Sequence, residues 1–521
     1  MFINEKNATR YTLYVMLLSF IGRFAIGKWT GLGIGESYYY GGARILSLSY
    51  FDQPPFFMWV SGILMRVFGE TSLVLRLPAL VSFFGTSWII FLITKKLFNK
   101  VAGFYAVLFI SISGVFVLAG TWFQPDAFLM FFWVCYVYCL IQIIFLHKEE
   151  VKANLKTIYY WFVLSGIALG LTILSKYHAI FLVIGLFLFI STNKNYRHWL
   201  IHPGLYLSIF ISLLFAIPIF IWNYEHHFAS FLFQGSRALD GGNFKIHFDW
   251  FFRSILGQSL WLLPWIWVPL IMELIKSFKL RQVNSIYGFC FWLAITPIVF
   301  FTIITLWADL QYHFHWQAPG YMMLFIPLGK MIQEKLEGES KYRRIIKRWI
   351  IGSVAFTVIA FSFLAIHMQT GFWTWYGPKW IAMHTGGGAY DATMDGYDYT
   401  DLKDVFSNNG WLKDPNLFVG TTKWWMSGKV DWALKGNKDI ICFNQDARNY
   451  IYFSNEKNLI GKNAIVITKG EDPSIKNVIP YCDSLKQIQG VEIKRSGVSE
   501  LTLNLYYCKN FHNIENLPYT K

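Results

Sequence analysis

Eleven long apolar stretches run through the first part of this chain, and they constrain its fold more than any other feature. Most reach or approach the roughly 20 residues that a helix needs to span a bilayer. They lie at 11–27, 73–94, 102–121, 124–146, 158–175, 178–192, 204–222, 251–275, 286–308, 316–333 and 349–369. With 55% hydrophobic residues, 15% charged residues and a mean hydropathy of +0.38, the chain is too apolar for a soluble protein of 521 residues. We therefore predict a polytopic α-helical membrane protein with about 11 spans.

The charges of the connecting loops indicate the topology. A shorter apolar stretch, 56–69, contains Arg66 and is typical of a helix that lies at the membrane interface. With the N-terminus inside, six inner connections and the adjoining Lys330 hold 20 Lys and Arg residues, as the positive-inside rule requires. These connections are 1–10, 95–101, 147–157, 193–203, 276–285 and 334–348. The loop 28–72 and everything after about residue 370 are then predicted to lie outside.

The region after the last apolar stretch has a different composition. Residues 372–521 carry 17 Lys and Arg against 16 Asp and Glu, whereas residues 1–371 carry 29 against 15. The formal net charge of +15 therefore belongs to the membrane part, and it gives no reason to expect a nucleic-acid partner. We predict a transmembrane domain over 1–371 and a small extracytoplasmic α/β domain over 372–521.

Short β-rich runs alternate with helical ones in this C-terminal region. The runs are 416–420, 423–434, 439–444, 463–470 and 501–508. Its three cysteines, Cys442, Cys482 and Cys508, permit at most one internal disulfide, and position alone favours Cys482 with Cys508.

Polar and ionisable residues gather on the predicted outer face. The loop 33–55 places Glu36, Arg44 and Asp52 among tyrosines and phenylalanines at the membrane edge, where ionisable groups cost free energy and are usually functional. Other outer segments add Asp126, 176–178, 222–245 and 311–319. Together they supply the carboxylates, histidines, amides and cations that a cavity for a phosphate and several hydroxyls would need. This pattern suggests chemistry on a polar group carried by a lipid.

A series of short motifs follows one order along the chain. They are Glu36-Ser37-Tyr38-Tyr39, Tyr50-Phe51-Asp52-Gln53-Pro54-Pro55, Arg76-Leu77-Pro78, Pro125-Asp126, Ser175-Lys176-Tyr177, Trp222-Asn223 with His226, Phe233-Gln234 with Arg237, and His315-Trp316-Gln317-Ala318-Pro319. In this order and spacing they resemble bacterial glycosyltransferase family 39 of the C-type (GT-C) superfamily. That family includes protein O-mannosyltransferases and lipid A aminoarabinose transferases. The resemblance covers nearly the whole chain.

The resemblance implies a GT-C fold and transfer of a sugar from a polyprenyl phosphate donor to an acceptor on the outer face. In such a displacement a carboxylate can deprotonate the acceptor hydroxyl, while cations neutralise the departing phosphate. The preferred catalytic residues are Glu36 and Asp126, with Asp52 as a second candidate. The candidate donor-phosphate partners are Arg44, Lys176 and Arg237. The expected substrate cavity also includes Tyr38, Tyr39, Tyr177, Asn223, His226, Gln234, His315 and Trp316.

The chain departs from the family pattern in places. Many members have Asp-Glu where this chain has Gly35-Glu36, so the work of the missing acid would pass to Glu36. The lipid A aminoarabinose transferases place an Arg and a Lys where this chain has Tyr38 and Gln53. Identical donor and acceptor chemistry is therefore not implied.

Several candidates also have a structural interpretation. Asp52 would cap the interfacial helix and Asp126 the helix 127–146, because Asp is a favoured N-cap. Lys176 would extend from a span to the headgroups. His226 is more often a hydrogen-bonding loop residue than a ligand, and no Cys/His spacing argues for a metal. We expect no cofactor, and the sequence leaves a divalent metal open.

We expect an integral-membrane glycosyltransferase of the bacterial inner membrane, with its active site and C-terminal domain facing the periplasm. Its partners would be an undecaprenyl phosphate-linked hexose or pentose and an envelope acceptor such as lipid A or lipopolysaccharide. A protein O-mannosyltransferase-type enzyme, with a protein acceptor, is one alternative. A transporter or flippase of lipid-linked sugars is an alternative of another class, but it should show repeated halves, and the sequence shows no internal repeat.

Overall fold

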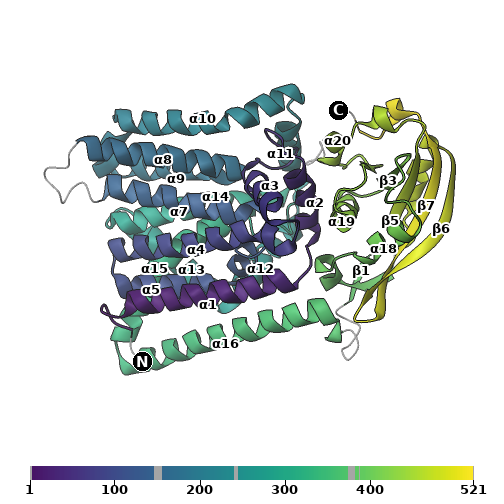
Figure 1. Cartoon of the computed structure of the whole chain (residues 1–521). Coiled ribbons are helices and arrows are strands. Elements are labelled where there is room, and N and C mark those ends of the chain that lie inside the picture. Colours follow the sequence, from purple (N-terminus) through teal and green to yellow (C-terminus); the bar gives the residue numbers. More distant parts are fainter. Residues whose placement is uncertain (1–2, 146–154, 240–244, 374–381, 386–387, 520–521) are drawn as a thin grey trace.

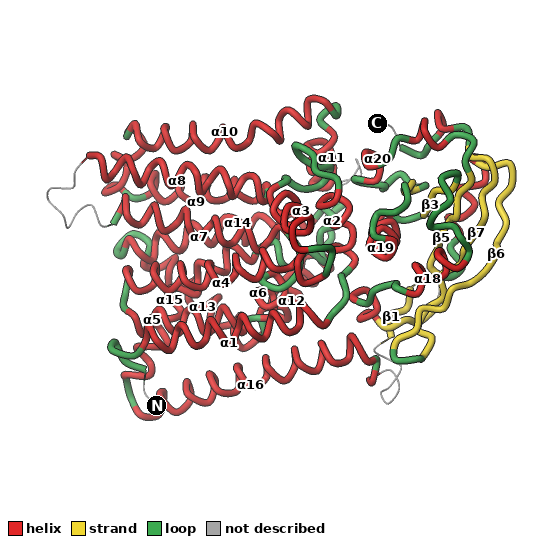
Figure 2. Tube along the Cα trace, in the orientation of Figure 1, coloured by secondary structure: helices red, strands yellow, loops and turns green. Residues whose placement is uncertain are grey.

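The structure, a computed structural model, describes residues 3–145, 155–239, 245–373, 382–385 and 388–519. A bundle of long helices is followed by a smaller part built around a β-sheet, which lies at one end of the bundle (Figure 1). Figure 2 shows that the strands lie in this smaller part alone, within the described residues. The predicted fold class, a multi-pass helical membrane protein with a small C-terminal α/β part, is confirmed.

Each of the eleven predicted spans is largely helical. The helices are α1 (Ala8–Trp29), α4 (Ser72–Leu97), α5 (Lys100–Ile112) with α6 (Gly114–Ala119), α7 (Pro125–Ile144), α8 (Leu155–Ser175), α9 (Ile180–Thr192), α10 (Pro203–Glu225), α12 (Phe248–Leu262) with α13 (Pro264–Leu280), α14 (Ser285–Ile303), α15 (Ala318–Glu337) and α16 (Ser340–Thr370). Among the described residues, six helices are long and apolar enough to cross a membrane, or up to eight if each bent pair is one span. This criterion gives fewer spans than predicted, because several apolar segments are short or broken.

The stretch 251–275 is one such segment, and it forms two helices instead of one continuous helix. Helices α12 and α13 meet at Leu263 with a bend of 109°. Pro264 begins α13, and a proline disfavours helical backbone at the residue before it. Leu263 itself lies outside the helical region, with a φ of +71°, and α12 ends there.

The first loop forms two short helices at the sheet end of the bundle, the end that faces the β-sheet part. Helix α2 (Ile34–Arg44) lies at 83° to α1, and α3 (Phe56–Phe68) lies beside it (Figure 1). Helix α3 is apolar but shorter than a membrane span, which is consistent with the prediction that 56–69 does not cross the membrane.

A five-stranded sheet of order β4-β3-β5-β7-β6 organises the C-terminal part. The strands are β3 (Leu417–Thr421), β4 (Ile440–Cys442), β5 (Asn463–Lys469), β6 (Cys482–Arg495) and β7 (Val498–Phe511). Strand β3 is parallel to β4 and β5, whereas β7 is antiparallel to β5 and β6. A short hairpin, β1 (Ala382–Thr385) with β2 (Gly388–Asp391), and helix α18 (Asp401–Asn408) precede the sheet, and α19 (Trp424–Leu434) follows β3. A disulfide joins Cys482 to Cys508, the pair that position favoured.

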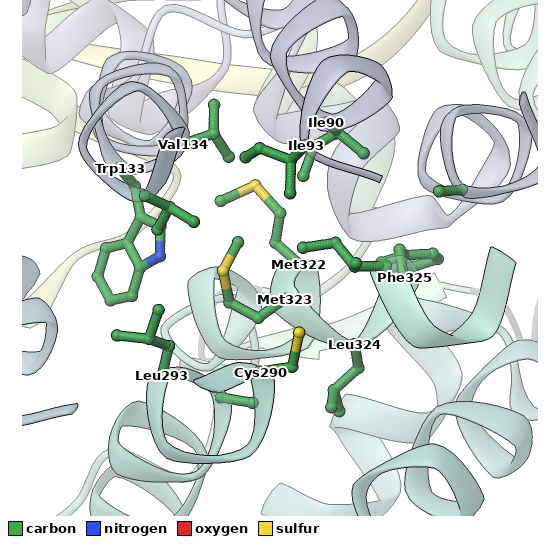
Figure 3. Close-up of a cluster of buried hydrophobic side chains, with 14 of the residues drawn as sticks. Ile90, Ile93, Trp133, Val134, Cys290, Leu293, Met322, Met323, Leu324 and Phe325 are labelled. Carbon is green, nitrogen blue, oxygen red and sulfur yellow. The ribbon is translucent and has the colours of Figure 1, made fainter. Parts of the chain in front are cut away.

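The bundle is held together by an apolar core among α4, α7, α14 and α15. Figure 3 shows Ile90 and Ile93 meeting Trp133, Val134, Cys290, Leu293 and the row Met322 to Phe325. Because this interior is closely packed, the ends of the helices have fixed relative positions. The polar residues discussed below lie at or beside these ends.

The C-terminal part packs directly on the first loop. The fully buried Lys429 of α19 donates from Nζ to Leu32 O at 2.6 Å, and Leu32 N donates to Asp398 Oδ1 at 2.9 Å. Gly428 lies so close to Tyr38 that an added Cβ would be 2.5 Å from its backbone nitrogen. The loop 28–72 and the C-terminal part are therefore at the same end of the bundle.

Candidate active site

Two residues from neighbouring helices form a buried ion pair at the sheet end. Asp126 lies in the first turn of α7, and Lys176 directly follows α8. Lys176 Nζ is 2.8 Å from Asp126 Oδ1, and the two side chains are 4% and 7% exposed. Lys176 thus turns into the protein instead of toward headgroups, and Gln124 holds the N-cap position of α7. Neither structural interpretation describes these residues.

A cavity of about 200 Å³ lies beside this pair. Its polar lining consists of Gln53, Lys176, Tyr177, His178, Gln234 and Arg237. Its apolar lining includes Ile180, Phe181, Phe300, Phe301, Ile304 and Trp316. The cavity therefore combines two cations with an aromatic and aliphatic wall.

Trp316 and the nearby histidines hold the two cations in place. Arg237, from α11 (Ala229–Leu239), contacts His313 Nε2 through Nη2 at 2.8 Å. The guanidinium carbon of Arg237 lies 5.0 Å from the Trp316 ring centroid, and Lys176 Nζ lies 5.9 Å from it. Aromatic faces attract cations at such distances. Lys176 and Arg237 therefore both contact the Trp316 ring.

The histidines beside the cavity are uncharged near neutral pH. Burial, with Arg237 nearby, lowers the pKa of His313 to about 3. Burial also lowers the pKa of His315 to about 4, although Asp126 acts in the opposite direction. The positive charge of the cavity is therefore carried by Lys176 and Arg237.

Asp52 is a second buried carboxylate, 3% exposed. Tyr38 donates its hydroxyl to Asp52 Oδ1 at 3.1 Å, and Gln234 Nε2 donates to the Asp52 backbone oxygen at 2.7 Å. Arg448 Nη1 approaches Oδ2 at 3.9 Å. Burial raises the pKa of Asp52, although Arg448 and the Tyr38 hydrogen bond act against this shift. Pro55 is the N-cap of α3, so Asp52 does not cap that helix.

Glu36 has a full set of partners elsewhere. Arg76 donates to both of its oxygens, from Nε at 2.7 Å and from Nη2 at 2.5 Å. The backbone N–H groups of Phe123 and Gly33 donate to Oε1 and Oε2 at 2.7 and 2.8 Å. Glu36 and Arg76 are each 1% exposed. This geometry argues against the expected role of Glu36 as a base and favours a role in fixing α2 against α4 and α7.

Arg44 is also engaged away from the cavity. Its Nη2 lies 3.2 Å from Asp431 Oδ1 of α19. Arg44 is not among the described residues that line the cavity. The expectation that Arg44 binds the donor phosphate is therefore not supported, and its guanidinium joins α2 to the C-terminal part instead.

The remaining candidates separate into two groups. Tyr177, Gln234 and Trp316 line the cavity, and the Tyr177 hydroxyl is 2.8 Å from Ser230 Oγ. Tyr38 and Tyr39 lie near Asp52, and His315 lies near Asp126. Asn223 and His226 serve the turn between α10 and α11. Asn223 bonds to Ile219 O and Phe231 N, and His226 stacks on Trp222 at 4.1 Å.

Sequence reasoning missed Arg448, which comes from a region where acidic and basic residues nearly balance. No local signal distinguishes it from the other arginines of that region. His313 was missed as an individual residue, although it lies in the outer segment 311–319. Within the described ranges, no group of three His, Cys, Asp or Glu side chains could hold a metal ion.

Comparison with known proteins agrees with this architecture. Residues 52–222 match a family model described as dolichyl-phosphate-mannose-protein mannosyltransferase. A comparison with curated proteins found no match. The chain is similar to the crystal structure of ArnT from Cupriavidus metallidurans bound to undecaprenyl phosphate, with 14% identity and a TM-score of 0.64 over 96% of this chain and 98% of that one. The chain is also similar to the structure of ArnT from the same organism in the apo state, with 13% identity, a TM-score of 0.63 and the same coverage.

A second solved protein shares the fold over a smaller part of its length. The chain is similar to the archaeal oligosaccharyltransferase AglB from Archaeoglobus fulgidus, in complex with an inhibitory peptide and a dolichol-phosphate, with 12% identity and a TM-score of 0.52. That match covers 88% of this chain and 70% of AglB. The chain thus has the fold of ArnT and AglB. Together with the family model over residues 52–222, this agrees with the resemblance stated from the motifs.

Proposed function

We propose that this protein transfers a sugar from a polyprenyl phosphate, such as undecaprenyl phosphate, to an acceptor of the bacterial envelope. The observation that carries the proposal is the cavity in which Lys176 and Arg237 lie beside an apolar wall. A polyprenyl phosphate has a matching division into a charged head and an isoprenoid chain. The ArnT structure is bound to undecaprenyl phosphate and the AglB structure is in complex with a dolichol-phosphate, which supports the same class of donor here.

The donor phosphate would lie between Lys176 and Arg237. An ammonium and a guanidinium donate charge-assisted hydrogen bonds to phosphate, and such bonds are short and strong. They would also neutralise the charge that develops on the phosphate as the sugar leaves. Asp126 would then keep Lys176 charged and oriented, because their ion pair is almost fully buried.

The isoprenoid chain would leave the cavity toward the lipid. Ile180 and Phe300 belong to the cavity wall, yet they are 53% and 47% exposed on the surface of the bundle. In a membrane such apolar surface contacts acyl chains, so a lipid substrate can enter there without crossing water. The cavity is thus accessible to a donor that stays in the bilayer.

Asp52 is our choice for the base that deprotonates the acceptor. It adjoins Gln53 of the cavity lining, and its oxygens are bonded to Tyr38 and approached by Arg448, which leaves acceptor capacity on the carboxylate. A buried carboxylate with a raised pKa is better matched to proton transfer near neutral pH than an ordinary one. Glu36, whose lone pairs are occupied, would act only on the position of α2.

The acceptor we propose is an envelope glycolipid such as lipid A or lipopolysaccharide. The enzyme would lie in the inner membrane with the active site facing the periplasm. The match to ArnT over 96% of this chain and 98% of that one supports this choice. The family model over residues 52–222, described as dolichyl-phosphate-mannose-protein mannosyltransferase, supports the alternative with a protein acceptor.

Two measurements test the proposal. Purified protein in nanodiscs is given undecaprenyl phosphate linked to radiolabelled mannose or aminoarabinose, together with an envelope lipid extract, and labelled product is measured. Mass spectrometry then compares envelope lipids and glycoproteins of cells with and without the gene. Label in glycolipid, with a matching mass difference in the cells, is the expected result. Label in protein would favour the mannosyltransferase type, and translocation of the donor without transfer would favour a flippase.

A further inference from the structure

We propose that the turn 446–449 of the C-terminal part belongs to the active site, with Arg448 as the positioning residue that holds the Asp52 carboxylate for proton transfer. The inference rests on the proposed function, because it takes Asp52 as the base. The turn follows β4 and leads into the short helix α20 (Tyr450–Phe453). The base that deprotonates the acceptor, Asp52, and the residue that positions it, Arg448, would thus come from opposite ends of the chain.

Arg448 is held by contacts on several sides. Its guanidinium carbon lies 3.7 Å from the ring centroid of Trp424, and its Nε donates to Asp446 Oδ1 at 3.1 Å. Its backbone φ is +51°, in the left-handed region that residues other than glycine seldom adopt unless their surroundings hold them there. In this conformation Nη1 is directed toward Asp52 Oδ2 at 3.9 Å.

The next residue binds both neighbours of the carboxylate. Asn449 Oδ1 accepts a hydrogen bond from Phe51 N at 2.8 Å. Its backbone N–H donates to the Tyr38 hydroxyl at 3.3 Å, and that hydroxyl donates to Asp52 Oδ1. Asn449 is 1% exposed, so these contacts are shielded from solvent. The turn 446–449 therefore reaches Asp52 in three ways. Arg448 approaches the carboxylate, and Asn449 N binds the Tyr38 hydroxyl that donates to it. Asn449 Oδ1 binds the backbone N–H of Phe51, the residue before Asp52.

The charge of Arg448 acts on the ionisation of Asp52. The titratable and charged groups that face Asp52 are Tyr38 and Tyr39 of α2, Tyr177 before α9, Arg237 of α11 and Arg448. Burial raises the pKa of Asp52, and Arg448 is the strongest of the influences that lower it. Without Arg448 the pKa of Asp52 would rise further, and less of the base would be ionised at a given pH.

Attachment of the C-terminal part does not depend on this contact. Lys429 and Asp398 bind Leu32, and Asp431 binds Arg44 at 3.2 Å. The Asp431 pair resembles the Arg448 pair in kind, since each joins the first loop to the C-terminal part. It lies away from the cavity lining and is therefore a matched control.

The test compares full-length wild-type protein with Arg448→Gln, Arg448→Lys and the control Asp431→Asn in nanodiscs. The probe is whichever undecaprenyl phosphate-linked sugar, mannose or aminoarabinose, the wild-type protein transfers, and kcat and donor KM are measured across pH. We expect Arg448→Gln to lower kcat at pH 7 at least about tenfold, with little change in KM, and to move the acidic limb of the kcat profile to higher pH. Arg448→Lys should return the limb toward that of wild type, and Asp431→Asn should leave it in place.

Several outcomes would overturn the inference. One such outcome is an Arg448→Gln variant with wild-type kcat and an unchanged acidic limb of its pH–kcat profile. Another is an Asp431→Asn variant whose acidic limb moves as far as that of Arg448→Gln. Should Arg448→Gln not fold, Asn449→Ala replaces it: loss of the Phe51 contact should lower kcat without moving the limb, and an unchanged kcat would count against the turn. A wild-type protein that transfers neither sugar would refute the proposed function instead.

Discussion

Replacement of the Asp126–Lys176 pair by neutral residues tests the phosphate site most directly. Lys176→Gln alone is unsuitable, because it leaves a carboxylate that is 7% exposed without its cation. Breaking a buried pair in this way typically costs about 3–5 kcal/mol of stability. In the double variant Asp126→Asn with Lys176→Gln, no buried charge is left without its partner, so folding should be largely retained.

The expected change in donor affinity follows from the loss of one charged contact. A hydrogen bond to a charged group contributes roughly 1.5–3 kcal/mol. Its removal should therefore weaken undecaprenyl phosphate binding about ten- to hundredfold. Arg237→Gln should weaken undecaprenyl phosphate binding by a similar factor. Its effect on stability should be smaller, because its partner His313 is a neutral imidazole with a pKa of about 3.

Equilibrium binding of radiolabelled undecaprenyl phosphate to purified protein, with thermal unfolding measured in parallel, provides the assay. Arg253→Gln is the control, since Arg253 is a half-exposed arginine that pairs with Asp249 at 3.5 Å and is absent from the described cavity lining. If the double variant and Arg237→Gln both bind the lipid as wild type does, the phosphate site is not in this cavity. Weaker binding by Arg253→Gln as well would indicate a general effect of surface charge.

Four further predictions concern the carboxylates and the topology. Asp52→Asn should lower turnover about a hundredfold while the thermal midpoint changes little, because an amide cannot accept the proton; wild-type turnover in a transfer assay would remove Asp52 as the base. In the wild-type enzyme, turnover should fall as pH decreases through the pKa of Asp52, which burial raises above its ordinary value, and a pH–kcat profile that is flat over the acidic range would contradict this assignment. Glu36→Gln should lower the free energy of unfolding by about 3–5 kcal/mol, since it leaves Arg76 buried with a neutral partner, and an unchanged denaturation midpoint would show that the pair is not structural. Cysteines introduced at Leu48 and Ile460, which are 43% and 52% exposed, should both react with an impermeant reagent in cells with a permeabilised outer membrane; labelling of either site only after lysis would refute their common periplasmic side.

The membrane fold was accessible from sequence because its signals are local. An apolar run of about 20 residues reports a helix in lipid whatever its neighbours are, and the basic connections report their side of the membrane one loop at a time. For the same reason 56–69 could be recognised as a helix too short to be a span. Strand β6 was missed because its exposed face makes the run 482–495 largely polar, so that no clear apolar pattern marks it. The bend at Leu263 was missed because the composition of 251–275 resembles an uninterrupted span, although Pro264 was the local signal for it.

The roles of the charged residues were decided by tertiary structure. Glu36, Arg44 and Asp52 lie within one short segment and look equivalent in sequence, yet each meets a different partner: Arg76, Asp431 and Arg448 respectively. Asp52 and Arg448 are separated by almost 400 residues, and the sequence around either one carries no information about the other. Residue type and membrane depth determined that ionisable groups would gather at this end of the bundle. Which carboxylate is neutralised, and which keeps capacity to accept a proton, depends on distances between groups that only the folded chain brings together.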